Sequence, residues 1–298
     1  MMAQFTLPHI LQRRIEALAA HLLAPPGAPG FDFSSPPGEP ALTPAGSVSW
    51  RVFANPVTLF VGGVAAVLLE LAEPRVRAGV WEHSSFRTDP LARLQRTGLA
   101  ALVTVYGAET GARAMIAGVN RLHARIAGST PAGAAYRADD PELLDWVQAT
   151  ALWGFLEAYH RYACQLSHAE RDVCFAEGAP VAALYGATGA PRSEAEWQAL
   201  LARTAPSLEP SATLHEFLAI MRRVPALPRL GRPAQLLLVK AAADLLPDDL
   251  ADRLGLLAWR LKAWERPLAA AMAAAAERLL IRSWPSAQAR RRLGLPEA

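Results

Sequence analysis

One histidine stands among apolar residues at helical spacing in the segment from residue 108 to residue 126. His123 follows Val119 by four residues and precedes Ile126 by three, so the three side chains share one helix face. An imidazole that points into an apolar interior needs a hydrogen-bond partner or a metal. His123 is therefore a candidate metal ligand, and a core histidine with a hydrogen-bond partner is the alternative.

A second polar group lies in the stretch DPLARLQRT, residues 89–97. Arg93 and Thr97 are four residues apart and hence neighbours on a helix, and Arg96 directly precedes Thr97. An arginine and a threonine beside an apolar stripe can bind a carboxylate or polarise bound oxygen. The alternative is a solvated helix face on which the arginines pack only their aliphatic stems.

The motifs of the common enzyme classes are missing from the sequence. Its seven histidines form no HExxH pattern and have no zinc-type spacing to cysteine. No GxSxG, Walker loop or GxGxxG after a strand occurs either, so hydrolase, kinase and dinucleotide functions have no support. Cys164 and Cys174 are too few for a disulfide scaffold, and the expected compartment is the reducing cytoplasm.

Helix start signals recur along the chain and determine the expected fold class. Asp89-Pro90 and Asp140-Pro141 each predict a helix with proline in its first turn. Ser167 and Ser193 are each followed three residues later by glutamate, the form of a capping box. Val48 to Phe53 is the one candidate strand, and it is short. The sequence therefore predicts an all-α protein.

The chain divides into a short N-terminal part and one main domain. Residues 1–46 contain a first helix and then an extended arm, since residues 24–46 include seven prolines and four glycines. Residues 47–298 are expected to form a single compact multi-helix domain. Near its C-terminus, Pro267 should divide the helical stretch from Ala251 to Ile281 into two helices or kink one.

Composition excludes several partners. Of the 298 residues, 52% are hydrophobic and 19% are charged, which is ample for a folded core. Thirty basic residues face 27 acidic ones, an excess too small to predict nucleic-acid binding. The longest apolar run, Val57 to Leu69, is 13 residues long, whereas a membrane span needs about 20. With Gly62 and Gly63 inside it, this run predicts a closely packed core helix.

Five stretches in order resemble a known family. Between about residues 50 and 197 the chain reads FVGGVAAVLLELAEPRVRAGVWEHSSF, DPLARLQRT, VNRLHARIAG, YRADDPELLDWVQAT and LSHAERDVCFAEGAPVAALYG. Together they resemble the MpaB-type oxygenases, a family that includes the bacterial latex-clearing protein. The resemblance implies an all-helical fold with a b-type haem in its interior.

The resemblance also implies roles for individual residues. The family's proximal iron ligand corresponds to His123, and its functional arginine and threonine correspond to Arg93 and Thr97. Arg93 or Arg96 would hold a haem propionate, and the second ring nitrogen of His123 would donate to a carbonyl or carboxylate. Two positions depart from the pattern. Arg96 stands where the latex-clearing protein has a lysine that caps the iron, and Gln148 stands where many relatives have histidine.

These observations predict a haem b-dependent oxygenase that uses dioxygen on an apolar substrate, which in known relatives is isoprenoid. Because a guanidinium has no lone pair to offer iron, Arg96 predicts an open or water-filled distal position at rest. One alternative is a haem oxidase or hydroxylase of a small metabolite, since a fold does not determine a substrate. Others are a haem-binding protein without turnover, and a helical protein that has lost its cofactor.

Overall fold

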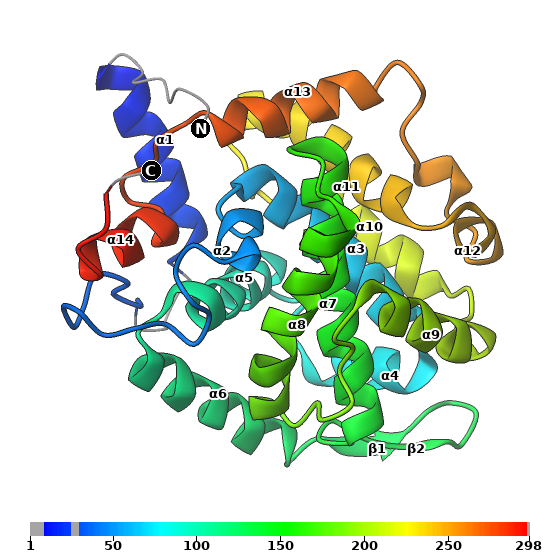
Figure 1. Ribbon diagram of the computed structural model, residues 1–298. Coiled ribbons are helices and arrows are strands. Elements are labelled where there is room, and N and C mark those ends of the chain that lie inside the picture. Colours follow the sequence, from blue (N-terminus) through cyan, green and yellow to red (C-terminus); the bar gives the residue numbers. More distant parts are fainter. Residues whose placement is uncertain (1–8, 25–29, 297–298) are drawn as a thin grey trace.

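The computed structural model describes residues 9–24 and 30–296. Helices make up most of the described chain (Figure 1). Its α-helices are α1 (His9–Leu22), α2 (Val48–Val52), α3 (Pro56–Ala72), α4 (Pro74–His83), α5 (Pro90–Tyr106), α6 (Glu109–His123), α7 (Pro141–Tyr162), α8 (His168–Leu184), α9 (Glu194–Thr204), α10 (Ala212–Arg223), α11 (Arg232–Leu245), α12 (Asp248–Arg253), α13 (Arg266–Glu277) and α14 (Pro285–Arg292). The predicted all-α fold class is confirmed.

The centre of the fold is the crossing of α3 and α7, which run through the middle of the molecule in Figure 1. Gly62 of α3 and Gly154 of α7 meet there backbone to backbone. A Cβ atom on Gly62 would lie 2.5 Å from the carbonyl oxygen of Gly154. Leu68 and Leu69 of α3 are fully buried. The apolar run from Val57 to Leu69 is thus a buried core helix, as predicted.

The predicted helix starts are present. The Asp89 carboxylate accepts a hydrogen bond from the Ala92 N–H at 3.2 Å, and Asp140 accepts one from the Glu142 N–H at 2.9 Å. Ser167 forms both halves of a capping box. The Ser193 hydroxyl caps α9 by accepting a hydrogen bond from the Glu196 N–H. The Glu196 carboxylate accepts from the Arg192 N–H and not from that of Ser193, so only half of the predicted capping box forms.

The prediction of a strand at Val48 to Phe53 is wrong, because this segment forms α2. The Ser47 hydroxyl caps the helix by accepting from the Trp50 N–H. The Glu177 carboxylate of α8 accepts hydrogen bonds from the backbone N–H groups of Val48 and Ser49, which a local pattern could not reveal. In the described chain the strands form one antiparallel pair, β1 (Ala127–Ser129) and β2 (Ala135–Arg137).

The described part of the N-terminal arm packs against the end of the chain. Phe33 is 2% exposed and belongs to the main core. The guanidinium of Arg292 in α14 donates to the carbonyl oxygens of Phe33, at 2.7 Å, and Glu39, at 2.9 Å. The arm prolines at 25, 26 and 29 lie outside the described residues. The division of the chain at residue 46 remains a prediction.

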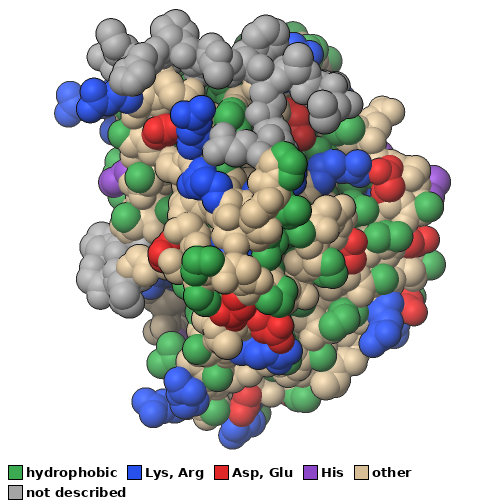
Figure 2. All heavy atoms as spheres, turned by 60° about the vertical axis from the view of Figure 1, so that its left-hand side comes forward, with side chains coloured by type: hydrophobic (Ala, Val, Ile, Leu, Met, Phe, Trp, Pro, Cys, Tyr) green, Lys and Arg blue, Asp and Glu red, His purple; other side chains and the backbone are tan. Residues whose placement is uncertain are grey.

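The C-terminal stretch contains two separate helices, α12 and α13, with Pro267 in the first turn of α13. Within the described residues, no helix alone has the length and apolar character of a membrane span. The pair of α3 and α4 meets that test only jointly, with a bend of 112° between them. On the face drawn in Figure 2, basic and acidic side chains are interspersed.

Candidate functional site

A cavity of about 750 Å³ lies among α3, α4, α5, α6, α7 and α8. Its volume is within the range of small-molecule and cofactor sites, about 300–1,000 Å³. Aliphatic side chains such as Val76, Leu143, Val147 and Leu152 form much of its wall. The cavity is therefore a slot for a largely apolar ligand, and its few polar groups decide what chemistry it can perform.

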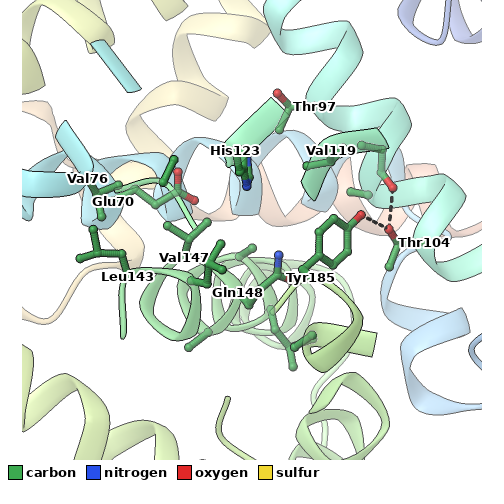
Figure 3. Close-up of a pocket in the computed structure, with 18 of the residues that line it drawn as sticks. Glu70, Val76, Thr97, Thr104, Val119, His123, Leu143, Val147, Gln148 and Tyr185 are labelled. Carbon is green, nitrogen blue, oxygen red and sulfur yellow. Dashed lines mark hydrogen bonds between the residues drawn. The ribbon is translucent and has the colours of Figure 1, made fainter. Parts of the chain in front are cut away.

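His123 lies at the end of α6 and projects into this cavity (Figure 3). The helix is held by the buried side chains of Ala112 and Ile116, while Leu122 is 60% exposed. The predicted apolar stripe therefore packs inward along most of α6, and its last turn reaches the cavity rim. After His123 the chain turns at once toward β1, with the Ile126 N–H donating to the His123 carbonyl at 2.9 Å.

The imidazole of His123 has the features of a metal ligand. Its Nδ1 atom is buried and has no hydrogen-bond partner, so the expected bond from the second ring nitrogen to a carbonyl or carboxylate is not formed. Burial lowers the pKa of His123, the positive charge of Arg93 lowers it further, and Asp139 opposes this. The ring is thereby held neutral, which is the form that coordinates a metal.

Arg93, Arg96 and Thr97, all on α5, line the same cavity as His123. The Arg93 guanidinium donates to the Thr97 hydroxyl and lies 5.1 Å from the centre of the Phe86 ring. The Thr97 hydroxyl donates in turn to the Arg93 carbonyl oxygen at 2.9 Å. The structure thus brings together every site residue that the sequence predicted.

The cations of α5 remain available for an anionic group. Arg96 donates to the Ser85 hydroxyl at 2.7 Å. In the described chain neither Arg93 nor Arg96 is part of an ion pair. Burial lowers the pKa of Arg93, an effect that the charge of Glu70 counteracts and that of Arg96 reinforces. A carboxylate entering this region would meet two unpaired guanidinium groups.

Glu70 is a cavity residue that the sequence analysis did not identify. It lies near the end of α3, and Figure 3 draws its carboxyl beside Val76, Leu143 and Val147. Burial raises the pKa of Glu70 to about 7, although the positive charge of Arg93 opposes the shift. The one sequence signal was its place as the first charged residue after the apolar run that ends at Leu69.

A second imidazole, that of His83, also lines the cavity. Its Nε2 lies 3.2 Å from the hydroxyl of Tyr136, which donates to Glu82 at 3.2 Å. His83 ends α4, and Ser84 follows as its C-cap. Because the His83 ring already has a partner, it is a weaker candidate ligand than the ring of His123.

The side of the cavity near α8 is apolar apart from one internally paired group. The hydroxyls of Thr104 and Tyr185 lie 2.8 Å apart and hydrogen-bond to each other. Figure 3 draws this pair on the opposite side of His123 from Glu70, with Gln148 below the imidazole. The Thr104 hydroxyl also donates to the Ala100 carbonyl oxygen at 2.8 Å, so the Tyr185 hydroxyl donates to Thr104. Since both hydroxyls have partners in the chain, this side offers a ligand mainly apolar contact.

The comparison with protein families decides what kind of protein this is. Residues 50–277 match the family described as ER-bound oxygenase mpaB/B'/rubber oxygenase, catalytic domain. The chain belongs to the mpaB/rubber oxygenase family. Neither a curated protein nor a solved structure matches it.

The mpaB/rubber oxygenase catalytic domain extends here from α2 to the end of α13. It includes all the residues that line the cavity from Phe53 to Pro191, whereas the lining residues Thr43 and Ser49, α1 and α14 lie outside it. The match continues well beyond Trp197, where the sequence resemblance ended. The chain is thus an oxygenase-family protein whose predicted site residues meet inside the family's catalytic domain.

Proposed function

We propose that the protein is a haem b-dependent oxygenase that uses dioxygen to oxidise an apolar organic substrate. One observation supports this proposal above all. A buried imidazole nitrogen of His123 without a hydrogen-bond partner lies in the same apolar cavity as the guanidinium groups of Arg93 and Arg96, which form no ion pair. A haem site needs an apolar slot, an inward imidazole and cations near its propionates.

The chain's donor set favours a porphyrin over a bare metal ion. Among the described residues, no group of three or more His, Cys, Asp or Glu side chains could hold a metal. His123 offers a single nitrogen, and a porphyrin brings four more of its own. Haem, when bound, supplies the redox-active iron at which dioxygen chemistry takes place.

The residues of the chain would bind the haem, orient the polar groups of the cavity and exclude water from it. His123 would hold the iron through its neutral imidazole, and Arg93 and Arg96 would hold propionate carboxylates. Arg93 and Thr97 form the proposed catalytic pair, in which the Thr97 hydroxyl orients the guanidinium. The aliphatic wall excludes water and binds the apolar substrate. Arg96 has no lone pair and therefore would not coordinate the iron.

Product analysis with isotopically labelled dioxygen tests the reaction. The protein with haem is supplied with linear isoprenoids of increasing length, and oxygen uptake and products are measured. Cleavage of a carbon–carbon double bond predicts one labelled oxygen in each of two carbonyl fragments. A singly labelled, uncleaved alcohol would indicate a hydroxylase instead, and an unlabelled product an oxidase. Haem binding without oxygen uptake on any substrate would contradict an enzymatic role.

A further inference from the structure

The carboxyl of Glu70 is a polar group without a partner in an otherwise aliphatic stretch of the cavity wall. No hydrogen bond or ion pair joins its side chain to any other described residue. Leu69 and Leu71, its neighbours on α3, are fully buried, so the helix cannot rotate to carry Glu70 out to solvent. The carboxyl is therefore fixed in the cavity.

Arg93 does not explain this carboxyl as one half of an ion pair. Its guanidinium is instead held by the Thr97 hydroxyl and the Phe86 ring, and the two charges act on each other only through space. A leucine at this position would extend the aliphatic wall at no electrostatic cost, whereas a partly buried carboxyl that faces this wall without a partner is poorly solvated. The hydrogen-bonding capacity of Glu70 would therefore be satisfied by a bound ligand.

We propose that Glu70 accepts a hydrogen bond from a hydroxyl group at one end of the otherwise apolar substrate. This inference rests on the proposed function and narrows its substrate class from hydrocarbons to alcohols with long apolar bodies. A pure hydrocarbon would cover the carboxyl and leave it unpaired, which costs affinity. A hydroxyl replaces the water that the carboxyl loses when the substrate enters.

The charges around the cavity exclude the other polar classes. Of the arginines that line it, Arg75 and Arg137 are ion-paired with neighbouring carboxylates, but Arg93 and Arg96 are not, so a cationic amine would meet an excess of positive charge. A substrate carboxylate would be drawn to Arg93 and Arg96 and would meet a like charge beside Glu70. The Thr104–Tyr185 pair lies on the other side of His123 and is already satisfied, so it does not compete for the hydroxyl.

Binding of four matched ligands tests the proposal: farnesol, its hydrocarbon farnesene, farnesylamine and farnesoate. Dissociation constants are measured by calorimetry on the protein with haem. A hydrogen bond to a carboxyl predicts that farnesol binds about ten-fold or more tightly than farnesene. In Glu70→Leu this ratio should fall to about one, with farnesol binding more weakly and farnesene more tightly than to the wild type. In Glu70→Gln the amide oxygen can still accept a hydrogen bond, so the preference for farnesol over farnesene should be intermediate between those of the wild type and Glu70→Leu.

Thr104→Val is the matched control, since it removes a hydroxyl from the opposite side of the same cavity and should leave the ratio unchanged. Circular dichroism of each variant verifies its fold, and Glu70→Ala replaces Glu70→Leu if the latter does not fold. An unchanged farnesol-to-farnesene ratio in Glu70→Leu would overturn the proposal, as would tighter binding of farnesylamine or farnesoate than of farnesol.

The same titrations on the haem-free protein separate this inference from the proposed function. Loss of the alcohol preference in Glu70→Leu with normal haem binding supports both. A wild-type protein that takes up no haem would end the proposed function, while the ratio in the haem-free protein still decides the role of Glu70. Normal haem binding with an unaltered ratio would overturn the role of Glu70 alone.

Discussion

The ionisation of Glu70 should leave a measurable signature in the stability of the protein. Burial raises the pKa of Glu70 from 4.5 to about 7 in the folded state. Between these values the unfolded state has lost the proton while the folded state retains it. The unfolded state then binds fewer protons, so the free energy of unfolding decreases as pH rises through this window.

We therefore predict that Glu70→Gln removes part of this pH dependence. Through this carboxyl, the free energy of unfolding of the wild type should decrease by at most about 3 kcal/mol between pH 4.5 and pH 7. The measurement is urea unfolding of both proteins across that range. His123 and His160, whose pKa values burial lowers, act in the opposite direction, so the difference between the two proteins is the informative quantity.

Glu142→Gln is the control for this measurement, because the Glu142 side chain is 74% exposed at the start of α7. It should leave the wild-type pH dependence in place. If Glu70→Gln and the wild type lose stability in parallel, the carboxyl of Glu70 is solvated and not buried in the cavity wall.

At the residue scale, spacing and resemblance together predicted His123, Arg93, Arg96 and Thr97. Local helix periodicity indicated which helix faces these residues share, and the resemblance implied their roles. Glu70 could not be found in this way, since the direction of its side chain depends on how α3 is rotated against α7. That rotation is determined by a contact between residues far apart in the chain.

At the scale of elements, the crossing of α3 and α7 supports one wall of the cavity. Gly62→Ala should destabilise the protein by about 2–3 kcal/mol, because the new Cβ would collide with backbone atoms of Gly154 that cannot rotate away. The measurement is urea unfolding. We also expect weaker haem binding, since a shift of α3 against α7 displaces the cavity wall.

Gly63→Ala provides a matched control one residue away. Its Cβ would lie 3.6 Å from the Phe155 ring, an ordinary contact. Alanine also favours a helix over glycine by about 1 kcal/mol, so Gly63→Ala should be neutral or stabilising. Equal destabilisation by the two substitutions would mean that α3 tolerates no added methyl group anywhere, and the close crossing would not be the cause.

The cap of α5 positions the polar residues of the cavity. Asp89→Ala removes the bond to the Ala92 N–H and should cost about 1 kcal/mol of stability. The first turn of α5 carries Arg93, so haem affinity should decrease as well. Ser211→Ala is the control, because Ser211 precedes α10 without capping it and should be close to neutral. If Asp89→Ala lowers the stability but leaves the haem affinity unchanged, the cap of α5 does not position Arg93 for haem binding.

The segment from Val48 to Phe53 illustrates what local patterns miss at this scale. Its β-branched and aromatic residues are typical of a strand. The Ser47 cap and the distant carboxylate of Glu177 nevertheless stabilise a short helix. Helix starts at Asp89 and Asp140 could be predicted because the capping group and the helix are neighbours in sequence.

At the scale of the whole molecule, Arg292 connects α14 to the N-terminal arm. It is 3% exposed and donates to the carbonyls of Phe33 and Glu39. Arg292→Met should destabilise the protein by about 3 kcal/mol, because both bonds are charge-assisted and the carbonyls lose their partner. Hydrogen exchange at residues 33–39 should accelerate in the variant.

Arg291→Met tests whether this effect is specific, since Arg291 is an exposed neighbour on α14 that donates to the Arg282 carbonyl and not to residues 33–39, so exchange at those residues should not change. Unaltered exchange at residues 33–39 in Arg292→Met would mean that the arm is held by other contacts. The arm's packing could not be predicted, because the proline and glycine pattern indicates only an extended chain.

The central claim is that His123 holds a haem inside the cavity, and a haem titration followed by absorption spectroscopy tests it most directly. The wild type should develop an intense Soret band at one haem per chain. His83→Ala, which removes the other imidazole that lines the cavity, should keep that spectrum, whereas His123→Ala should lose it or shift it strongly. A wild type that binds no haem, or an unchanged spectrum in His123→Ala, would contradict the account.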